Sequence, residues 1–145
     1  MALDLTAIRR AFRTKLTSIP GLPPSSRRSW EGVKFDPPSP TNADPANTLW
    51  IRETLLTGSE QLAATDTIET RGEYRVDVFI GDGKGVEPAE ELAKAIADEF
   101  TPKGGFTGTG VTIYVMSTQR RTPFITDDVW RMFPVVVSWG SFSPS

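Results

Sequence analysis

A glycine-rich segment that follows a strongly alternating stretch is the part of the chain closest to a phosphate-binding turn. Its residues are Gly81, Gly83, Lys84 and Gly85, and an apolar helical pattern begins at Pro88. The spacing differs from the known fingerprints, because a dinucleotide-binding turn needs G-x-G-x-x-G and a P-loop needs four residues before Gly-Lys-Ser/Thr. A single lysine is also a weak signal for a phosphate or a carboxylate. We therefore interpret the segment as a flexible structural turn.

Carboxylates gather just after this turn, where they could serve as acids, bases or metal ligands. They are Glu87, Glu90, Glu91, Asp98 and Glu99. On a helix, most of them point away from the apolar stripe, and the early ones complement the positive end of the helix dipole. A two-metal site needs acids from separate elements, and Asp77 is the one obvious candidate. We expect a solvated helix face.

Two missing residue types limit the chemistry further. The 145 residues include no histidine and no cysteine. Disulfides, thiolate nucleophiles, imidazole bases and zinc sites built from these residues are thereby excluded. No serine has a histidine or cysteine partner for nucleophilic catalysis. We expect no catalytic, cofactor-binding or metal-binding residues, hence no enzyme, and we look for function in the surfaces.

The charge is unevenly distributed, although the net charge is only −2. Residues 1–35 contain seven basic and two acidic residues. Residues 36–110 contain six basic and fourteen acidic residues. A basic first third and an acidic middle suit a subunit whose opposite sides meet copies of itself or a charged partner. Two ordinary solvated faces would give the same counts.

Two arginine pairs with a tryptophan nearby in sequence could contact nucleic acid. They are Arg27-Arg28 and Arg120-Arg121. Phosphate pairing and aromatic stacking would use such residues, but a pI of about 5.2 argues against a dedicated DNA binder. We favour salt bridges from Arg120 and Arg121 to acidic groups of a neighbouring copy.

Length and hydropathy predict one domain over residues 1–145, 38% of them hydrophobic. No stretch approaches the length of a membrane span, and the N-terminus has no signal-peptide core, so we expect a soluble intracellular product. Apolar spacing predicts an amphipathic helix from Leu5 to Ile19, capped by Asp4, and a second helix after Pro88. Between and after the helices, alternation predicts strands, which together give an α/β fold.

Two polar stretches, 36–47 and 58–67, are predicted to be extended surface loops. The first is rich in proline, which excludes helix and central strand. Loops of this length in a small domain are more often contact segments or disordered than simple connections. The aromatic residues Trp50, Phe79 and Trp139 are predicted on a second sheet face, where tryptophan is favoured at interfaces. Ordinary core packing is the alternative.

The order of segments resembles the tail terminator-like proteins of long-tailed bacteriophages over nearly the whole chain. The phrases that carry the resemblance run from Ile8-Arg9-x-Ala11-Phe12 through Ile19-Pro20-Gly21-Leu22-Pro23, Trp30-Glu31-Gly32-Val33-x-Phe35-x-Pro37-Pro38 and Leu49-Trp50-Ile51-Arg52 to Tyr74-x-Val76-Asp77-Val78-Phe79, Gly83-Lys84-Gly85 and Val135-Val136-Val137-Ser138-Trp139. They contain no catalytic signature.

The resemblance implies an α+β protein with two helices on one face of a mixed, mainly antiparallel sheet of four to six strands. It implies a structural virion protein that forms a ring, expected to be a hexamer, on the head-proximal end of the tail tube. Such a ring ends tube polymerisation and joins the tail to the head-completion or neck protein. DNA would pass through the lumen without specific binding, no membrane would be involved, and synthesis would take place in the host cytoplasm.

The resemblance carries no residue-level motif, so the interface predictions rest on physical arguments. We expect the two polar loops to contact the tube or the neck protein, and Arg120 and Arg121 to contact a neighbouring copy. The predicted interface residues are Arg120, Arg121, Trp50, Phe79, Glu60, Asp66 and Asp44. Another head–tail connector or tail-completion subunit remains an alternative, as does a small ligand-binding domain or enzyme.

Overall fold

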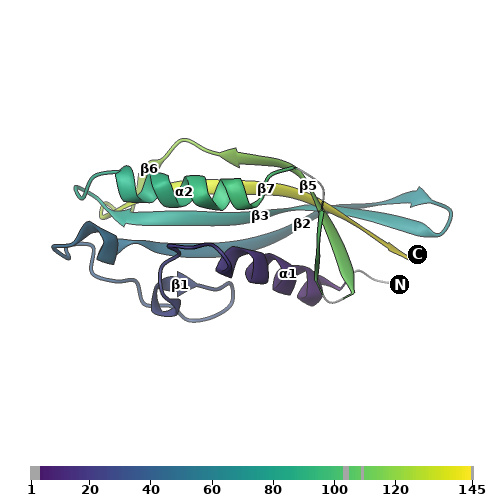
Figure 1. Ribbon diagram of the computed structural model, residues 1–145, viewed down its shortest axis with the longest axis horizontal. Helices are drawn as coiled ribbons and strands as arrows, with labels where there is room; N and C mark the ends of the chain where they lie inside the picture. The colour runs from purple at the N-terminus through teal and green to yellow at the C-terminus, as the bar shows by residue number, and fades with distance from the viewer. Residues whose placement is uncertain (1–3, 103–104, 109, 145) are drawn as a thin grey trace.

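The computed structural model describes residues 4–102, 105–108 and 110–144, which form two helices and a sheet (Figure 1). The elements are α1 (Leu5–Thr17), η1 (Ser25–Arg27), β1 (Arg28–Ser29), η2 (Pro45–Thr48), β2 (Trp50–Ala64), β3 (Thr67–Gly81), α2 (Glu87–Glu99), β4 (Gly105–Gly108), β5 (Val111–Arg120), β6 (Phe124–Thr126) and β7 (Trp130–Pro144), where η marks a short 3-10 helix. No helix in these ranges is long and apolar enough to cross a membrane.

The strands follow the order β1-β2-β3-β7-β5-β4, and β6 pairs with β7. All pairs are antiparallel except β1 with β2. The predicted α+β class with a mixed, mainly antiparallel sheet is therefore confirmed. The described residues give seven strands instead of four to six, because the two- and three-residue strands β1 and β6 pair with the longer ones.

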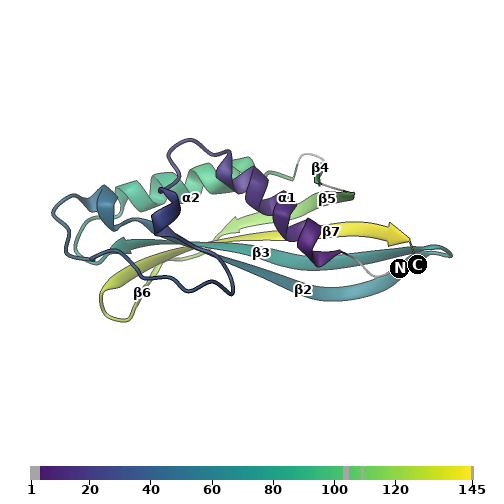
Figure 2. The ribbon, with the colours of Figure 1, turned by 90° about the horizontal axis from the view of Figure 1, so that it is seen from below.

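Both helices pack on the same face of the sheet, as Figure 2 shows. The α1 helix begins where the Asp4 carboxylate accepts a hydrogen bond from the Ala7 N–H at 3.1 Å, which confirms the predicted cap. The α2 helix has Pro88 in its first turn, where a missing N–H costs nothing. The apolar stripe of each helix is buried against the strands.

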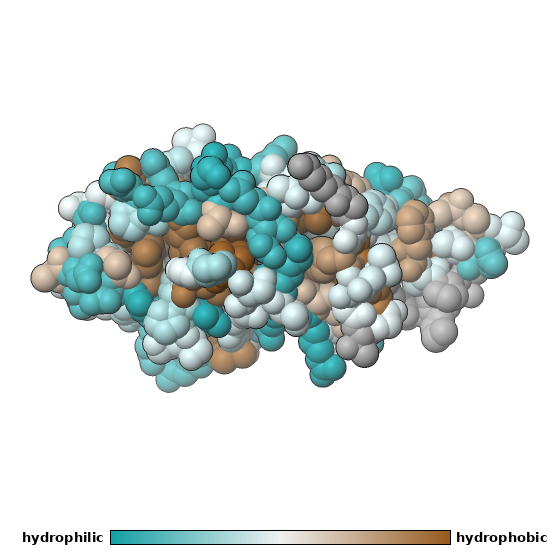
Figure 3. Space-filling model, in the orientation of Figure 1, coloured by the Kyte–Doolittle hydropathy of each residue, from teal (hydrophilic) through white to brown (hydrophobic). Residues whose placement is uncertain are grey.

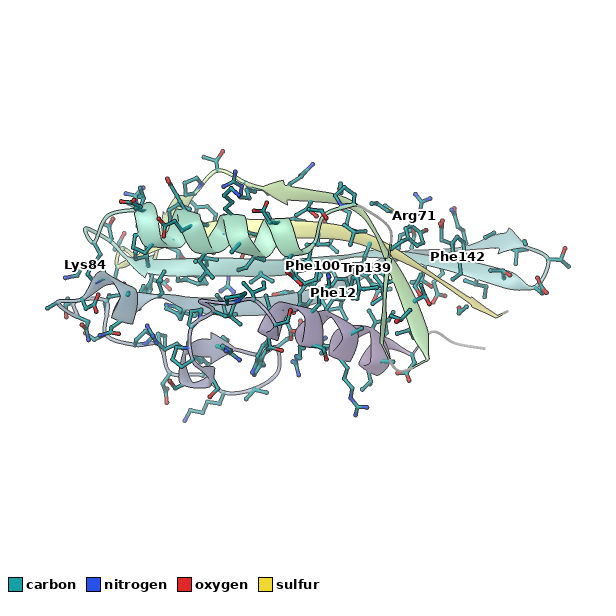
Figure 4. The ribbon with its side chains drawn as sticks, viewed as in Figure 1. Phe12, Arg71, Lys84, Phe100, Trp139 and Phe142 are labelled. Atoms are coloured by element: carbon teal, nitrogen blue, oxygen red, sulfur yellow. The ribbon has the colours of Figure 1, made fainter. Side chains whose placement is uncertain are left out.

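The main core lies between the helices and the sheet. Phe12 stacks on Tyr74 with ring centroids 4.2 Å apart, and Phe100 and Trp139 pack around the same ring (Figure 4). The prediction that Trp139 lies on the second sheet face is wrong. Trp139 shares its face with Val135 and Val137, because side chains two residues apart on a strand point the same way.

The second face carries a smaller core near the start of β2. Its buried members are Trp50, Phe79, Trp130 and Met132, with Phe35 packed against them. Phe35 belongs to residues 30–44, which form neither helix nor strand and cross this end of the sheet. The proline-rich connection therefore covers part of the second face.

The predicted polar loop at 58–67 is wrong, because β2 continues to Ala64 and β3 begins at Thr67. The turn between them is only Thr65 and Asp66, and a β-bulge lies near Gly58. The sequence of this part of β2 shows no alternation of apolar and polar residues. Neither helix covers it, so both of its faces accept polar residues (Figure 1). Backbone pairing with β3 and onward to β7 forms the strands instead.

Pro134 lies inside β7 and between β3 and β5, where a proline is unusual. The pairs with β5 stop at Val135, and those with β6 end at Met132, so Pro134 falls in the gap between the two. Its carbonyl accepts the Arg121 N–H at 3.0 Å. The position is a local edge, as the proline predicts, although the strand as a whole is central.

Candidate functional site

The glycine turn that opens α2 is built as a structural connection. Gly83 and Gly85 have φ values of +85° and +84°, which favour glycine. A side chain at Gly81 would meet the carbonyl of Pro40, and the Gly81 N–H donates to Thr48 at 3.1 Å. The end of β3 is therefore fixed against η2 and the segment before it. Lys84 lies at this end of the molecule (Figure 4).

The carboxylates of α2 are exposed or half-buried, in agreement with a solvated face. Lys94 and Asp98 form an ion pair at 2.6 Å along the helix, and Glu99 lies 3.5 Å from Lys15 of α1. Across the residues that the structure describes, no three acidic, histidine or cysteine side chains gather in a way that could hold a metal ion. The acidic residues act here as surface charges.

One carboxylate, that of Glu53, is fully buried beneath α1. The Arg13 guanidinium donates to both Glu53 oxygens at 2.7–3.0 Å, and the Tyr74 hydroxyl donates to Oε2 at 2.7 Å. Arg9 joins at 3.2 Å and also pairs with Glu31 at 2.6 Å. The group links α1 to β2 and β3, whose residues are far apart in sequence.

The contacts of this cluster shift the pKa of two of its members, Arg13 and Tyr74. Hydrogen bonding to Glu53 raises the pKa of Arg13 further above its usual value. Burial, with the nearby Glu53 carboxylate, raises the pKa of Tyr74 well above its usual value, so the phenol stays protonated. Every charge here has a partner within the chain, and we interpret the cluster as a structural clamp that holds α1 on the sheet.

The predicted interface residues Trp50 and Phe79 do lie together on the second sheet face. Their rings stack with centroids 3.8 Å apart, and Trp130 packs edge-on at 5.6 Å. Trp50 is 6% exposed and Phe79 is 1% exposed. These side chains have little surface left for a partner.

Beside this small core, the second face carries a ladder of charges. Asp77 pairs with Arg52 at 3.1 Å and with Arg75 at 3.8 Å. Further along, Arg121 approaches Glu73 of its own chain at 4.0 Å, and both remain partly exposed. The ladder neutralises most of its own charge.

Arg120 and Arg121 line one small cavity of about 180 Å³ between α2 and β7. Glu90 of α2 lies on the same cavity, with Phe133 and Pro134 as apolar walls. The two arginines are thus neighbours in space as well as in sequence. Glu90 and Glu73 are acidic groups of the same chain close to them.

The far end of β2 and β3 projects beyond both helices as an extension, which we call the arm and define as residues 57–70 (Figure 1). On its β3 side the arm also pairs with β7. Glu60 and Asp66 are exposed on it, and Leu62 is 66% exposed. In the space-filling view, hydrophobic and hydrophilic residues are mixed at this end (Figure 3). Asp44, in contrast, caps η2 before the opposite end of β2, accepting the Ala46 N–H at 3.1 Å.

The base of the arm is held by Glu69. Its carboxylate accepts hydrogen bonds from the Tyr114 hydroxyl, from Gln61 at 3.0 Å and from Arg71 at 2.8 Å. These bonds, that from Tyr114 first, lower the pKa of Glu69 below its usual value. Phe142 of β7 stacks on Tyr114 beside Arg71 (Figure 4).

A groove of about 820 Å³ lies between α1, the end of α2 and β4, and we call it the α1–β4 groove. Its charged residues are Arg10, Arg13, Lys15 and Glu99. Sequence reasoning missed this site because β4 is short and has no alternation. The basic N-terminal third was the only available signal.

The chain belongs to a family of phage tail structural proteins. The family model described as phage tail terminator protein matches residues 7–139, so the chain is a member of the phage tail terminator family and a component of the virion. The predicted family is thereby confirmed. No curated protein matches the chain.

Two solved structures share the fold. One, whose title names no function, has 21% sequence identity and a TM-score of 0.72, with 97% of this chain and 96% of that chain covered. Another, described as the virion of a native gene transfer agent particle, has 12% sequence identity and a TM-score of 0.56. The match covers 99% of this chain and 100% of that chain. At these identities the likeness concerns the fold alone.

Proposed function

We propose that the chain is a tail terminator that forms a ring on the head-proximal end of the tail tube. The ring, a hexamer, ends polymerisation of the major tail tube protein and offers its other side to the head-completion or neck protein. The observation that carries this proposal is the family match over residues 7–139. The role consists of binding, and no substrate is transformed.

The distribution of surfaces along the molecule supports this role. The arm projects at one end, and the 36–47 segment with the exposed Asp44 lies before the other end of β2. At about 3.3 Å per residue, the 15 residues of β2 separate these ends by roughly 45 Å. We assign the 36–47 segment to the tube or neck protein. We assign Arg120 and Arg121 to contacts with a neighbouring copy.

The acidic middle of the chain suits a channel for DNA. Residues 36–110 carry fourteen acidic and six basic residues, and like charges repel the phosphate backbone. We propose that DNA crosses the ring without specific binding. A structure of the ring in which basic residues line the lumen would contradict this part of the proposal.

Assembly and capping can be tested separately. Native mass spectrometry of the purified chain is expected to give a closed multimer of six copies. Added to polymerising tube protein of the same phage, the chain is expected to limit tube length and to label one tube end in electron micrographs. A chain that stays monomeric and leaves tube length unchanged would overturn the proposal.

Position in the virion distinguishes the alternative connector roles. Antibody against the chain is expected to label tails at their head-proximal end, and tails made without the chain are expected to be overlong and headless. Label on the head portal or on the distal tip would favour another connector. If charge reversal of Arg121 leaves the ring intact, then Arg121 is not part of the contact between subunits.

A further inference from the structure

The arm presents unneutralised negative charge on a rigid base. Residues 57–70 contain no lysine or arginine. Within the described part of the chain, neither Glu60 nor Asp66 forms an ion pair, whereas Glu69 is fully engaged at the base. Backbone pairing with β7 reaches Thr67, so the arm is supported almost to its turn. Its tip is therefore held in place, and its two acids have no ion-pair partner among the described residues.

The α1–β4 groove carries the opposite charge. Three basic residues line it against the single acid Glu99. Arg13 is engaged by Glu53 and Lys15 lies near Glu99, but the exposed Arg10 has no ion-pair partner among the residues described. The groove thus has a net positive charge, and Arg10 is the cation most available to a ligand.

The groove also has apolar surface and a free strand edge. Phe106 and Ala11 lie among its lining residues. Among the described strands β4 is the last in the sheet order, so one of its edges has no paired neighbour among them. An extended segment with acidic residues and one aliphatic side chain matches these features, because it combines charge pairing, apolar contact and access to backbone groups.

We propose that the arm of one copy enters the α1–β4 groove of the next copy in the ring. Glu60 and Asp66 face Arg10 and the other basic residues of the groove, and the exposed Leu62 covers Phe106. This contact rests on the proposed ring, whose members must be identical chains related by rotation.

Symmetry favours this assignment. A ring of identical subunits with three or more members uses heterologous contacts, in which two different patches of the same chain meet. An acidic projection and a basic recess on one chain are such a pair. The arm cannot fill its own groove, since it extends outward beyond both helices (Figure 1). The arm therefore contacts a second copy and not the tube or neck protein that its sequence suggested.

A charge-swap experiment tests the contact. Arg10→Glu alone and Glu60→Lys with Asp66→Lys are each expected to raise the concentration needed for ring assembly by roughly tenfold or more, because like charges then face each other. The triple variant restores opposite charges and is expected to recover most of the assembly. Lys94→Glu, a reversal on the exposed side of α2, is the matched control and is expected to assemble as the wild type does.

A cross-link reports the contact directly. The chain has no cysteine, so Thr14→Cys in the groove and Thr65→Cys in the arm turn introduce the only two thiols. Under oxidation they are expected to give a ladder of covalent multimers up to ring size. The control pair Thr14→Cys and Ser39→Cys, whose second thiol lies in the 36–47 segment, is expected to give none.

The outcomes separate the two proposals. Rings that form equally well with all reversals, together with cross-linking no greater than in the control pair, would overturn the arm contact and leave the terminator ring in place. A wild-type chain that forms no multimer at any concentration would overturn both.

Discussion

The two halves of the β2–β3 pair differ sharply although they are continuous strands. From Trp50 to Leu55, most side chains of β2 are buried, either beneath the helices or in the small aromatic core. From Leu56 to Ala64, every residue is exposed. We call the first half, with the helices packed on it, the body. The body is stabilised by burial of apolar surface, and the arm by backbone pairing and a few polar side chains.

The boundary between the halves lies at Gly72. A side chain there would collide with the carbonyl of Leu56 and lie 2.8 Å from Cζ2 of Trp139. The last large side chain of the main core thus packs directly on the backbone where the arm begins. The arm gains nothing from that core, which is why its length is best explained by a contact outside the chain.

The largest expected effect is in the body. Phe12→Ala removes a ring that is fully buried and contacts Tyr74, Phe100 and Trp139. The expected loss is about 3–5 kcal/mol in the free energy of unfolding, because a large cavity forms. Urea denaturation followed by tryptophan fluorescence measures it. A loss below about 1 kcal/mol would mean that the body does not depend on this core.

A smaller effect is expected where α1 is tied to the sheet by charge. Arg13→Met keeps the apolar stem but leaves buried Glu53 with only Arg9 and Tyr74 as partners. The expected cost is about 2 kcal/mol, the usual range for losing hydrogen bonds to a charged group. Arg10→Met, three residues away on the exposed side, is the control and should change stability by no more than about 0.5 kcal/mol. Equal effects of the two variants would show that the clamp adds no stability.

The elements of the body could be predicted from sequence because local patterns specify them. The apolar stripe with Asp4 at its start predicted α1, and the period-two pattern ending at Ile80 predicted the buried half of β3. The clamp could not be predicted, since Arg13 and Glu53 are 40 residues apart and only the fold brings them together. The same holds for Phe35 on Trp50, which depends on how the proline-rich segment crosses the sheet.

The arm escaped prediction for a different reason. The polar segment 58–67 was predicted to be a loop, because alternation requires one buried face and the β2 side of the arm has none. The candidate surfaces were therefore only partly found. Glu60 and Asp66 were identified as exposed acids, whereas the groove required knowledge that β4 lies beside α1.

A pH experiment isolates the base of the arm. The lowered pKa of Glu69, due first to the hydrogen bond from Tyr114, means that its ionised form is favoured in the folded chain. Its contribution is fully present above the ordinary carboxyl pKa of about 4.3, and it is lost as the pH falls through the lowered value. The difference in urea midpoint between wild type and Glu69→Gln should therefore be constant from about pH 7 to about pH 5 and shrink at lower pH. A difference that does not change with pH would show that the charge of Glu69 is unimportant.

The smallest effect is expected at the tip of the arm, and it separates the two halves most directly. Leu62→Ala removes a side chain that is 66% exposed, so the free energy of unfolding should change by no more than about 0.5 kcal/mol. Leu55→Ala, the same substitution seven residues earlier on β2, removes a side chain that is 9% exposed and should cost about 2–5 kcal/mol. Urea denaturation of both variants makes the comparison. A large loss from Leu62→Ala would mean that this side chain packs on its own chain, and Leu62 would then no longer be a candidate for the contact with another copy.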